Sequence, residues 1–300
     1  MATAVQLAAV GGAVACGPRR PPCCLTAAGP AGIAAPRRAR RAARVLRADA
    51  VHKSKKRQNY GRRSTTEDMY ISVQPDWSDL WRVDRAAKLI REGAVGILPT
   101  DTFPAFVCDL ENKDAVRRLY SVKEMNPSKP LSIMVRDFSD IDEYTHGFPS
   151  TNIPGRPDTF RVARQCLPGP YTFILAASKS MPKQCLDFQT GRSKHRKSVG
   201  VRMPDNPVCQ AVLSQLDHPL LVSSVPLESP DLQEFEDEPI VPDPVYMMDV
   251  YGPRGVEFVV DAGPYVGPII GSTVIDMTTG DISVIRVGKG DVARFGIEGP

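Results

Sequence analysis

The feature that most constrains the fold of this chain is the alternation of helix-like segments with short apolar runs. Apolar residues recur every three or four positions through Val83–Ile90 and again through Ala115–Val122. Each segment leads into a run of strand length, "AVGILPTDT" after the first and "PLSIMV" after the second. Because helical spacing marks one face of a helix and a short apolar run marks a buried strand, this order predicts a sheet covered by helices.

The same alternation continues toward the C-terminus. Further strands are expected in "PGPYTFILAAS", "SVGVRMP", "HPLLVSSV", "VEFVVDAG", "STVIDM" and "ISVIRVG". Another helix is expected around residues 160–166, and Asn206 followed by Pro207 has the N-cap and first-turn pattern of a helix. The last two strands are expected to form a hairpin through Thr279 and Gly280. The predicted fold class is α/β or α+β, with one open, twisted, mixed sheet.

The first 48 residues differ in composition from the rest. They contain eight arginines and much alanine, and the first acidic residue is Asp49. Such a start is typical of an organellar transit peptide, so residues 1–48 are predicted to direct the protein to the chloroplast, with the mitochondrion as second choice. A disordered tail is the alternative. Residues 49–66 would be a basic flexible arm, either a contact for RNA phosphates or a solvated linker.

The charge balance depends on that segment. The chain carries 38 basic and 34 acidic residues, and without the eight arginines of residues 1–48 the balance becomes 30 against 34, a net charge of about −4. Acidic residues gather among prolines at about residues 226–250, which contain no Lys or Arg. This stretch is expected to be an exposed, partly mobile insertion. The apolar runs are far shorter than the roughly 20 residues of a membrane span, so no membrane partner is expected.

Cysteine and histidine spacing predicts no metal site. Cys108, Cys166, Cys185 and Cys209 form no CxxC pair, and the four histidines of the chain show no ligand spacing. We therefore interpret these cysteines as reduced and packed. The sequence contains no GxxxxGK[ST] loop and no GxGxxG after a strand, and its spacing supports no Ser-His-Asp or Cys-His set.

Polar and cationic residues stand at the ends of the predicted strands. They are Thr100, Asp101, Thr102, Lys123, Lys129, Thr172, Arg202, Ser223, Ser224, Ser272, Thr273 and Arg286. Loops at strand ends converge in such sheets, and hydroxyls with Lys and Arg are suited to hold a phosphate. The pattern predicts one concave basic pocket for a phosphorylated ligand. Taken singly, the residues have simpler explanations: the threonines could cap a turn, and Arg202 could pair with Asp205.

Six motifs containing these residues resemble the YrdC-like domain of threonylcarbamoyl-adenylate synthases. They are "ILPTDTFPAFVCDL", "RLYSVKEMNPSKPLSIMV", "PGPYTFIL", "VGVRMPDNP", "PLLVSS" and "STVIDMTTGDISVIRVG". The resemblance covers about residues 67–296 and implies a single domain of that fold. It is closer to the YciO branch, because "SIMVRD" and "YTFIL" fit that branch and no Asn follows the "SS" strand.

The resemblance implies an activity and partners. Synthases of the family use ATP, L-threonine and bicarbonate, with Mg2+ expected beside the ATP, to make threonylcarbamoyl-AMP for the modification of tRNA. The domain is also described as binding double-stranded RNA through a basic concave face. The partners that the resemblance implies are therefore a nucleotide, L-threonine with bicarbonate, and double-stranded RNA or tRNA.

The resemblance also implies residue roles. Lys123 and Lys129 match the two lysines of the phosphate-binding motif KxR...K and are the candidate catalytic residues. Thr102 and Ser272 are the candidates for binding threonine. The candidates for binding the nucleotide are Lys123, Lys129, Thr172, Arg202, Ser224 and Arg286.

Two departures from the family pattern leave the activity open. Met125 stands at the arginine of KxR, and Pro226 stands at the asparagine of SxN. Loss of one preorganised donor typically costs roughly 2.7–4 kcal/mol of barrier. One hypothesis is a YciO-type module that binds ATP or AMP, and also double-stranded RNA, with weak or no synthase activity. The other is an active synthase serving organellar tRNA, and a scaffold with an emptied pocket is a third.

A basic run before the "SVGVRMP" strand supplies the RNA-contact candidates of the first hypothesis. They are Arg192, Lys194, Arg196 and Lys197, expected in a loop. Cations of this kind bind nucleic-acid phosphates without regard to sequence. A merely solvated loop is the alternative.

Overall fold

The computed structural model describes residues 69–149, 158–187, 192–226, 243–265, 270–279 and 282–295. All of them belong to one compact unit, residues 63–300. The expected transit peptide (1–48), the basic arm (49–66) and residues 227–242 of the expected insertion lie outside the described residues. Import into an organelle therefore stays a prediction.

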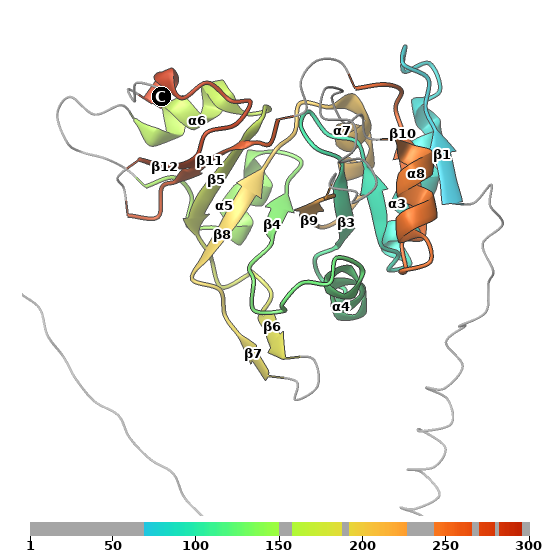
Figure 1. Ribbon diagram of the computed structural model, residues 1–300. Helices are drawn as coiled ribbons and strands as arrows, with labels where there is room; N and C mark the ends of the chain where they lie inside the picture. The colour runs from blue at the N-terminus through green and yellow to red at the C-terminus, as the bar shows by residue number, and fades with distance from the viewer. Residues whose placement is uncertain are drawn as a thin grey trace, which may run out of the picture. The chain divides into compact units, whose positions relative to one another are not determined.

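A ten-stranded mixed sheet forms the centre of this unit (Figure 1). Its strands are β1 (Tyr70–Ser72), β2 (Gly96–Leu98), β3 (Ala105–Asp109), β4 (Ser132–Met134), β5 (Tyr171–Ala176), β8 (Ser198–Arg202), β9 (Leu220–Ser224), β10 (Phe258–Asp261), β11 (Thr273–Asp276) and β12 (Ser283–Arg286). They lie in the order β1-β10-β2-β3-β9-β4-β8-β5-β11-β12. The sheet contains parallel pairs, such as β4 with β8, and antiparallel pairs, such as β3 with β9. The mixed sheet confirms the predicted fold class, and β11 and β12 pair antiparallel as expected.

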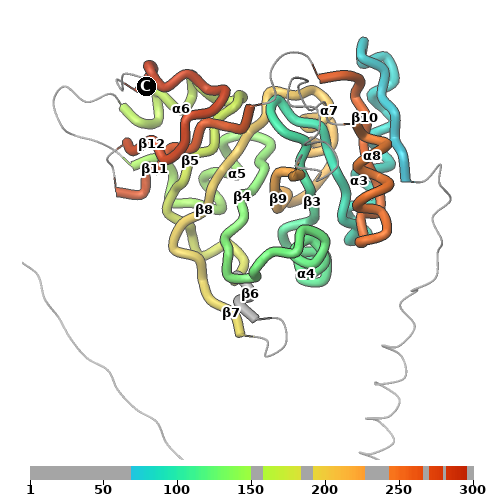
Figure 2. Tube along the Cα trace, viewed as in Figure 1, coloured from blue at the N-terminus to red at the C-terminus, as the bar shows by residue number. Residues whose placement is uncertain are grey.

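Helices cover both faces of the sheet. They are α3 (Val83–Arg91), α4 (Lys113–Val122), α5 (Phe138–Tyr144), α6 (Thr159–Cys166), α7 (Pro207–Leu213) and α8 (Pro244–Tyr251), with 3-10 turns at Leu80–Arg82 and Ala293–Phe295. Neighbouring strand residues point to opposite faces: Ile97 joins the core beneath α4, α5, α6 and α8, while Leu98 joins the core beneath α3 and α7. Figure 2 shows α3 and α8 at the β1 end and α6 at the β12 end.

One part of the sheet has no helix over it among the described residues. The core beneath α3 and α7 includes side chains from β1, β2, β3, β4, β9 and β10, but none from β5, β8, β11 or β12. On that uncovered part, Ile174 and Val274 are only half-buried, and Gly200 lies opposite Ile174. The sheet therefore has an open face over β5, β8 and β11, beside the part that α3 and α7 cover.

Short-range sequence signals fix several helix ends. The side chain of Asn112 accepts hydrogen bonds from two backbone amides of the first turn of α4. Asn206 caps α7 by accepting from the amide of Cys209, with Pro207 in the first turn, as the sequence predicts. Gly93 ends the α3 region with a φ of +91°, a conformation that favours glycine.

Two expectations about local structure are wrong. The basic run at residues 192–197 is not entirely a loop, because β7 (Arg192–Lys194) pairs antiparallel with β6 (Gln184–Asp187) in a hairpin that projects from the sheet (Figure 1). Three exposed polar residues give no apolar periodicity, so backbone pairing alone identifies this strand. The expected acidic insertion also ends early, since Asp243 caps α8 and Met247 is buried.

Three other elements carry weak patterns. β1 has three residues, β3 has five and α5 has seven, and the sequence analysis predicted none of them. Within the described residues, no helix combines the length and the apolar character that crossing a bilayer requires.

Candidate functional site

The loop between β2 and β3, residues 99–104, is the centre of the candidate site. Thr100 is buried, and its hydroxyl accepts a hydrogen bond from the amide of Thr102 at 3.1 Å and donates to the carbonyl of Phe103 at 2.6 Å. These bonds give the loop its turn. They also confirm the simpler explanation of Thr100 as a turn-capping residue, which does not prevent the loop from binding a ligand.

Arg202, at the end of β8, holds this loop against the sheet. Its Nη2 lies 2.9 Å from the Thr100 hydroxyl and 2.6 Å from Oδ1 of Asp101, and it also bonds the Thr102 hydroxyl. Arg202 therefore pairs with Asp101; Asp205 instead donates its backbone amide to Oδ2 of Asp101 at 3.2 Å. The Nε of Arg202 is buried and makes no hydrogen bond with any described residue, so one donor remains for another group.

A lysine that the sequence did not single out joins this cluster. The Nζ of Lys289 donates to the backbone carbonyl of Asp101 at 2.8 Å, although 188 positions separate the two residues. Lys289 follows β12 in a "VGKG" stretch without any phosphate-binding pattern. Only the folded arrangement of the chain brings Lys289 to this loop.

Three of the predicted residues form a second cluster at the β5–β11 edge of the loop. The hydroxyls of Thr172 and Ser272 share a buried hydrogen bond of 2.8 Å. Arg286 donates from Nη2 to the Ser272 carbonyl at 2.9 Å and to its hydroxyl at 3.3 Å. An added Cβ at Gly271 would lie 3.2 Å from the Phe103 ring and 3.3 Å from the guanidinium of Arg286. The β2–β3 loop and Arg286 therefore meet at Gly271.

Lys123 lies at the C-terminal end of α4 and reaches β9. Its Nζ donates to the hydroxyl of Ser223 and to the carbonyl of Ser224, both at 2.6 Å. Burial, and next the positive charge of Lys129, lower the pKa of Lys123 to about 8. Ser224 lies opposite Ala105, the first residue of β3, so this group borders the far end of the same loop.

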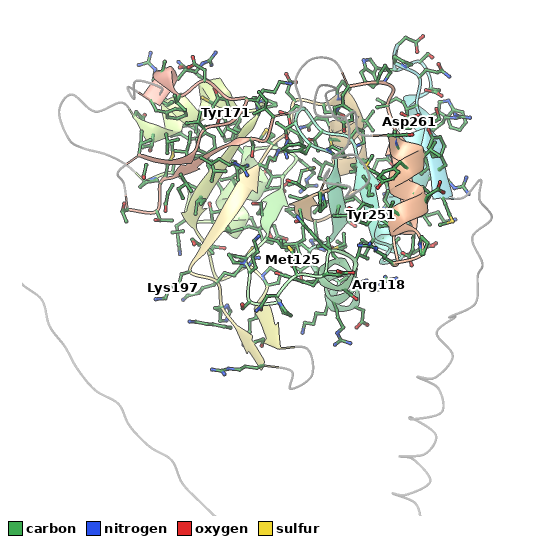
Figure 3. All side chains as sticks on the ribbon, in the orientation of Figure 1. Arg118, Met125, Tyr171, Lys197, Tyr251 and Asp261 are labelled. Atoms are coloured by element: carbon green, nitrogen blue, oxygen red, sulfur yellow. The ribbon has the colours of Figure 1, made fainter. Side chains whose placement is uncertain are left out.

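Lys129 and Met125 lie on the segment between α4 and β4. Lys129 is exposed, and its carbonyl accepts a hydrogen bond of 2.7 Å from the hydroxyl of Tyr120. Met125 is half-buried and packs against the core beneath α4, and Figure 3 places it beside that helix. It thus contributes packing at the position where the resemblance implies an arginine of the KxR motif.

The RNA-contact candidates divide into two kinds. Arg192, Lys194 and Lys197 are exposed on or next to the projecting hairpin, and Figure 3 shows Lys197 where the hairpin meets β8. Arg196 is half-buried and forms a side-chain hydrogen bond with Tyr120 on α4. The sequence analysis expected all four residues in one loop and did not distinguish them. Of the four, only Arg196 contacts the body of the domain.

The site offers cations and hydroxyls rather than a metal-binding cluster. Within the described ranges, no group of three or more His, Cys, Asp or Glu side chains could hold a metal ion. Asp101, the carboxylate of the β2–β3 loop, is paired with Arg202. The donors of the site are ammonium, guanidinium and hydroxyl groups, which suit an anionic ligand.

Comparison with known proteins matches most of this domain. The family model Sua5/YciO/YrdC, described as "Telomere recombination", matches residues 88–288. The uncharacterized protein YciO of Escherichia coli K12 is 30% identical over 226 residues, which are 75% of this chain and 98% of YciO. The crystal structure of E. coli YciO superimposes with a TM-score of 0.57 at 28% identity, covering 76% of this chain and 98% of that one.

Enzymes are also among the relatives. The threonylcarbamoyl-AMP synthase of Homo sapiens is 26% identical over 223 residues, 71% of this chain and 68% of the synthase. The crystal structure of P. abyssi Sua5 complexed with L-threonine matches with a TM-score of 0.57 at 23% identity, covering 73% of this chain and 57% of that one. At that identity the likeness concerns the fold.

Proposed function

This chain belongs to the Sua5/YciO/YrdC family, and from this premise we propose that it binds a nucleotide, ATP or AMP, in a basic pocket formed around the β2–β3 loop. The proposed protein is a YciO-type binding module with weak or no synthase activity. The phosphates would lie near Lys123 and Lys129. Thr172, Arg202, Ser224 and Arg286 would line the rest of the pocket.

The environment of Lys123 carries this proposal. None of the ion pairs among the described residues involves Lys123 or Lys129. The Lys123 ammonium is partly buried, and the positive charge of Lys129 adds to the free-energy cost of its charged form unless an anion offsets the charge. A lysine with a purely structural role would be more stable paired with a carboxylate or exposed to solvent than bonded to a hydroxyl and a carbonyl. A phosphate between the two lysines offsets both charges.

The expectation of weak catalysis rests on two side chains. Met125 packs against the core and has no N–H to offer a developing phosphate charge. Pro226 likewise has no side-chain donor, and its carbonyl accepts from the hydroxyl of Tyr251 at 3.3 Å. Binding tolerates the loss of such donors better than catalysis does, because catalysis depends on contacts that strengthen in the transition state.

Calorimetric titration with ATP and with AMP tests the proposal. The wild type is expected to bind ATP, and Lys123→Met is expected to weaken binding at least tenfold, since a charge-assisted hydrogen bond contributes about 1.5–3 kcal/mol. Lys88→Met, a change in the last turn of α3, is the matched control and should leave affinity within twofold. If the wild type and Lys123→Met bound ATP with equal affinity, the proposal that ATP binds at Lys123 would be wrong.

An active threonylcarbamoyl-AMP synthase is the second candidate. It is favoured by the contacts that Arg202 and Lys289 make with the β2–β3 loop, which carries Thr102, because a loop held in this way could bind an amino acid beside a nucleotide. The family contains synthases, and one Sua5 structure is a complex with L-threonine. In this proposal Thr102 and Ser272 orient threonine, while Lys123, Lys129 and Arg286 offset phosphate charge. Mg2+ would be held chiefly by the phosphates of ATP.

Pyrophosphate release from ATP separates the two candidates. A synthase releases pyrophosphate only when threonine and bicarbonate are both present, and Lys123→Met should abolish the release. The binding module binds ATP in calorimetry but shows no threonine-dependent release. Met125→Arg is an informative further variant, because a gain in release would show that this position limits turnover.

Double-stranded RNA binding is proposed for the projecting hairpin. Arg192, Lys194 and Lys197 are exposed there, and exposed cations bind phosphates with a strong salt dependence. Affinity for a double-stranded RNA should fall steeply with salt, with a log–log slope of roughly −0.9 per neutralised phosphate by analogy with duplex DNA. A flat salt response, or no loss in a triple Gln variant, would remove this proposal.

Chloroplast targeting is proposed for residues 1–48 on composition alone. A fusion of these residues to a fluorescent protein should enter chloroplasts. The same fusion with its eight arginines changed to glutamine should remain outside. Import into mitochondria would favour the second choice.

A further inference from the structure

Arg196 lies near the lysine pair through a shared tyrosine. The chain bends between β7 and β8 so that the Arg196 guanidinium bonds the side chain of Tyr120 on α4. The Tyr120 hydroxyl in turn donates to the carbonyl of Lys129 at 2.7 Å. One hydroxyl can donate one hydrogen bond and accept another. Tyr120 can therefore position both Arg196 and the segment that carries Lys129.

Lys123 belongs to the same neighbourhood. It follows Tyr120 by three positions at the end of α4, so the two side chains lie on the same side of the helix. The positive charge of Lys129 contributes to the lowered pKa of Lys123, and Lys129 lies on the segment that follows Lys123 and is bonded back to α4 through Tyr120. The C-terminal end of a helix also favours nearby cations. Arg196, Lys129 and Lys123 are thus gathered around the end of one helix.

The carboxylate and the thioether on the intervening segment do not occupy this region. Glu124 is exposed and lies 3.7 Å from Arg254, with which it pairs. Met125 packs against the core. Arg196 itself lies on the connection between β7 and β8.

We propose that Arg196 is a third phosphate-binding residue, which together with Lys123 and Lys129 selects a polyphosphate over a monophosphate. This inference rests on the proposed nucleotide binding and adds its ligand class: a nucleoside triphosphate or another polyphosphate chain. A planar guanidinium can bond two oxygens of one phosphate, while the two ammonium groups act as point charges on its neighbours. Three cations match the several charges of a triphosphate better than the single phosphate of AMP.

Calorimetry on the full chain with three ligands tests this inference. The wild type should bind ATP and inorganic pyrophosphate more tightly than AMP. Arg196→Gln should weaken ATP and pyrophosphate at least tenfold and AMP less than threefold. Arg161→Gln is the control, because that arginine is exposed on α6 and belongs to no proposed site, and it should change no affinity more than twofold.

Two more variants separate binding from structural support. Arg196→Lys keeps the charge but loses the fork, so it should recover part of the ATP affinity without disturbing the fold. Tyr120→Phe should lower ATP affinity less than Arg196→Gln does, because it loosens the guanidinium without removing it. Circular dichroism melts identify any variant that fails to fold.

The outcomes distinguish this inference from the function on which it rests. If the wild type binds neither ATP nor pyrophosphate, both the nucleotide proposal and the role of Arg196 are wrong. If ATP binds and Arg196→Gln behaves like Arg161→Gln, only the role of Arg196 is wrong. A loss that is equal for AMP and ATP, or one that Arg196→Lys does not recover at all, also overturns the selection of polyphosphates.

Discussion

Arg202 and Asp101 form an ion pair of 2.6 Å in which the two side chains are only 6% and 8% exposed. The pair joins the end of β8 to the loop between β2 and β3. Because both charges are desolvated, each depends on the other far more than in a surface pair. The geometry of the candidate site therefore depends on this contact.

Removal of the carboxylate should destabilise the domain strongly. Asp101→Ala leaves the Arg202 charge buried without a counter-ion, and such a change costs about 3–5 kcal/mol. Unfolding in urea, followed by circular dichroism, measures the free energy of unfolding. Asp114→Asn is the control: its exposed pair with Arg117 spans 3.8 Å, so the loss should be at most about 1 kcal/mol. Equal losses in the two variants would contradict the dependence of Arg202 on Asp101.

Thiol labelling should report whether the β2–β3 loop opens. Cys209 is fully buried and donates from Sγ to the carbonyl of Pro99 at 2.8 Å, and burial raises the pKa of its thiol. Alkylation of the native wild type should be slow at Cys209 and equally slow at Cys108 in β3. Asp101→Asn, which loosens the loop with less damage to the fold, should speed labelling at Cys209 only. Peptide mass spectrometry gives the two rates, and a parallel rise at both would indicate global unfolding instead.

Anion binding should depend on pH through Lys123. Its pKa of about 8 lies below the ordinary 10.5, so the ammonium is lost as the pH rises through 8. Phosphate groups with a second pKa near 6 are already ionised above pH 7.5. ATP affinity should therefore fall between pH 7.5 and pH 9.5, by up to roughly tenfold per unit above pH 8. Lys123→Met should bind weakly with no such fall, and an unchanged pH profile in that variant would assign the titration to another group.

Loss of the Lys123 proton at high pH has the opposite effect on the stability of the fold. Between about pH 8 and pH 10.5 the unfolded chain holds a proton on Lys123 that the folded chain has released. The free energy of unfolding should therefore rise with pH across this window. The contribution is found by comparing the wild type with Lys123→Met, since other groups cancel. If the ATP affinity and the Lys123 contribution to the free energy of unfolding both fell as the pH rises, the titration could not be assigned to Lys123.

The sequence predicted the local part of this fold. The helix around Ala86 and Ile90 is amphipathic, and Asn206 with Pro207 marks a helix start, so both signals lie within a few residues. β7 has no such signal, because its three residues are exposed and its stability comes from pairing with β6. The strand order is equally invisible, since β10 lies between β1 and β2 although nearly 160 residues separate it from β2.

The candidate site was also predicted only in part, because local signals identify some of its residues and contacts across the fold bring in the others. Residue type and strand-end position indicated Thr102 and Arg202, and the structure places them in contact. Lys289 and Arg196 gain their meaning from contacts across the fold, with Asp101 and Tyr120 respectively. Sequence spacing has no information about such contacts. It also cannot show that Met125 packs against the core.

Gly200 provides a test of the open face of the sheet. A Cβ added there would lie 2.5 Å from the hydroxyl of Ser132 and 3.2 Å from the Cγ2 methyl of Thr172. Gly200→Ala should therefore displace Thr172 and weaken its 2.8 Å bond to Ser272, at a cost of about 1–3 kcal/mol in the free energy of unfolding. Urea unfolding measures this loss.

Second-site changes show which neighbour is responsible. Thr172→Ser removes the crowded methyl and keeps the hydroxyl, so in combination with Gly200→Ala it should recover part of the loss. Ser132→Ala removes the other contact and should also recover part. Residues in direct contact typically couple by 0.5–3 kcal/mol, whereas independent sites add to within about 0.5 kcal/mol. Strict additivity in both double variants would mean that the close approach of Thr172 and Ser132 does not require glycine at position 200. The open face would then not be closely packed beside the candidate site.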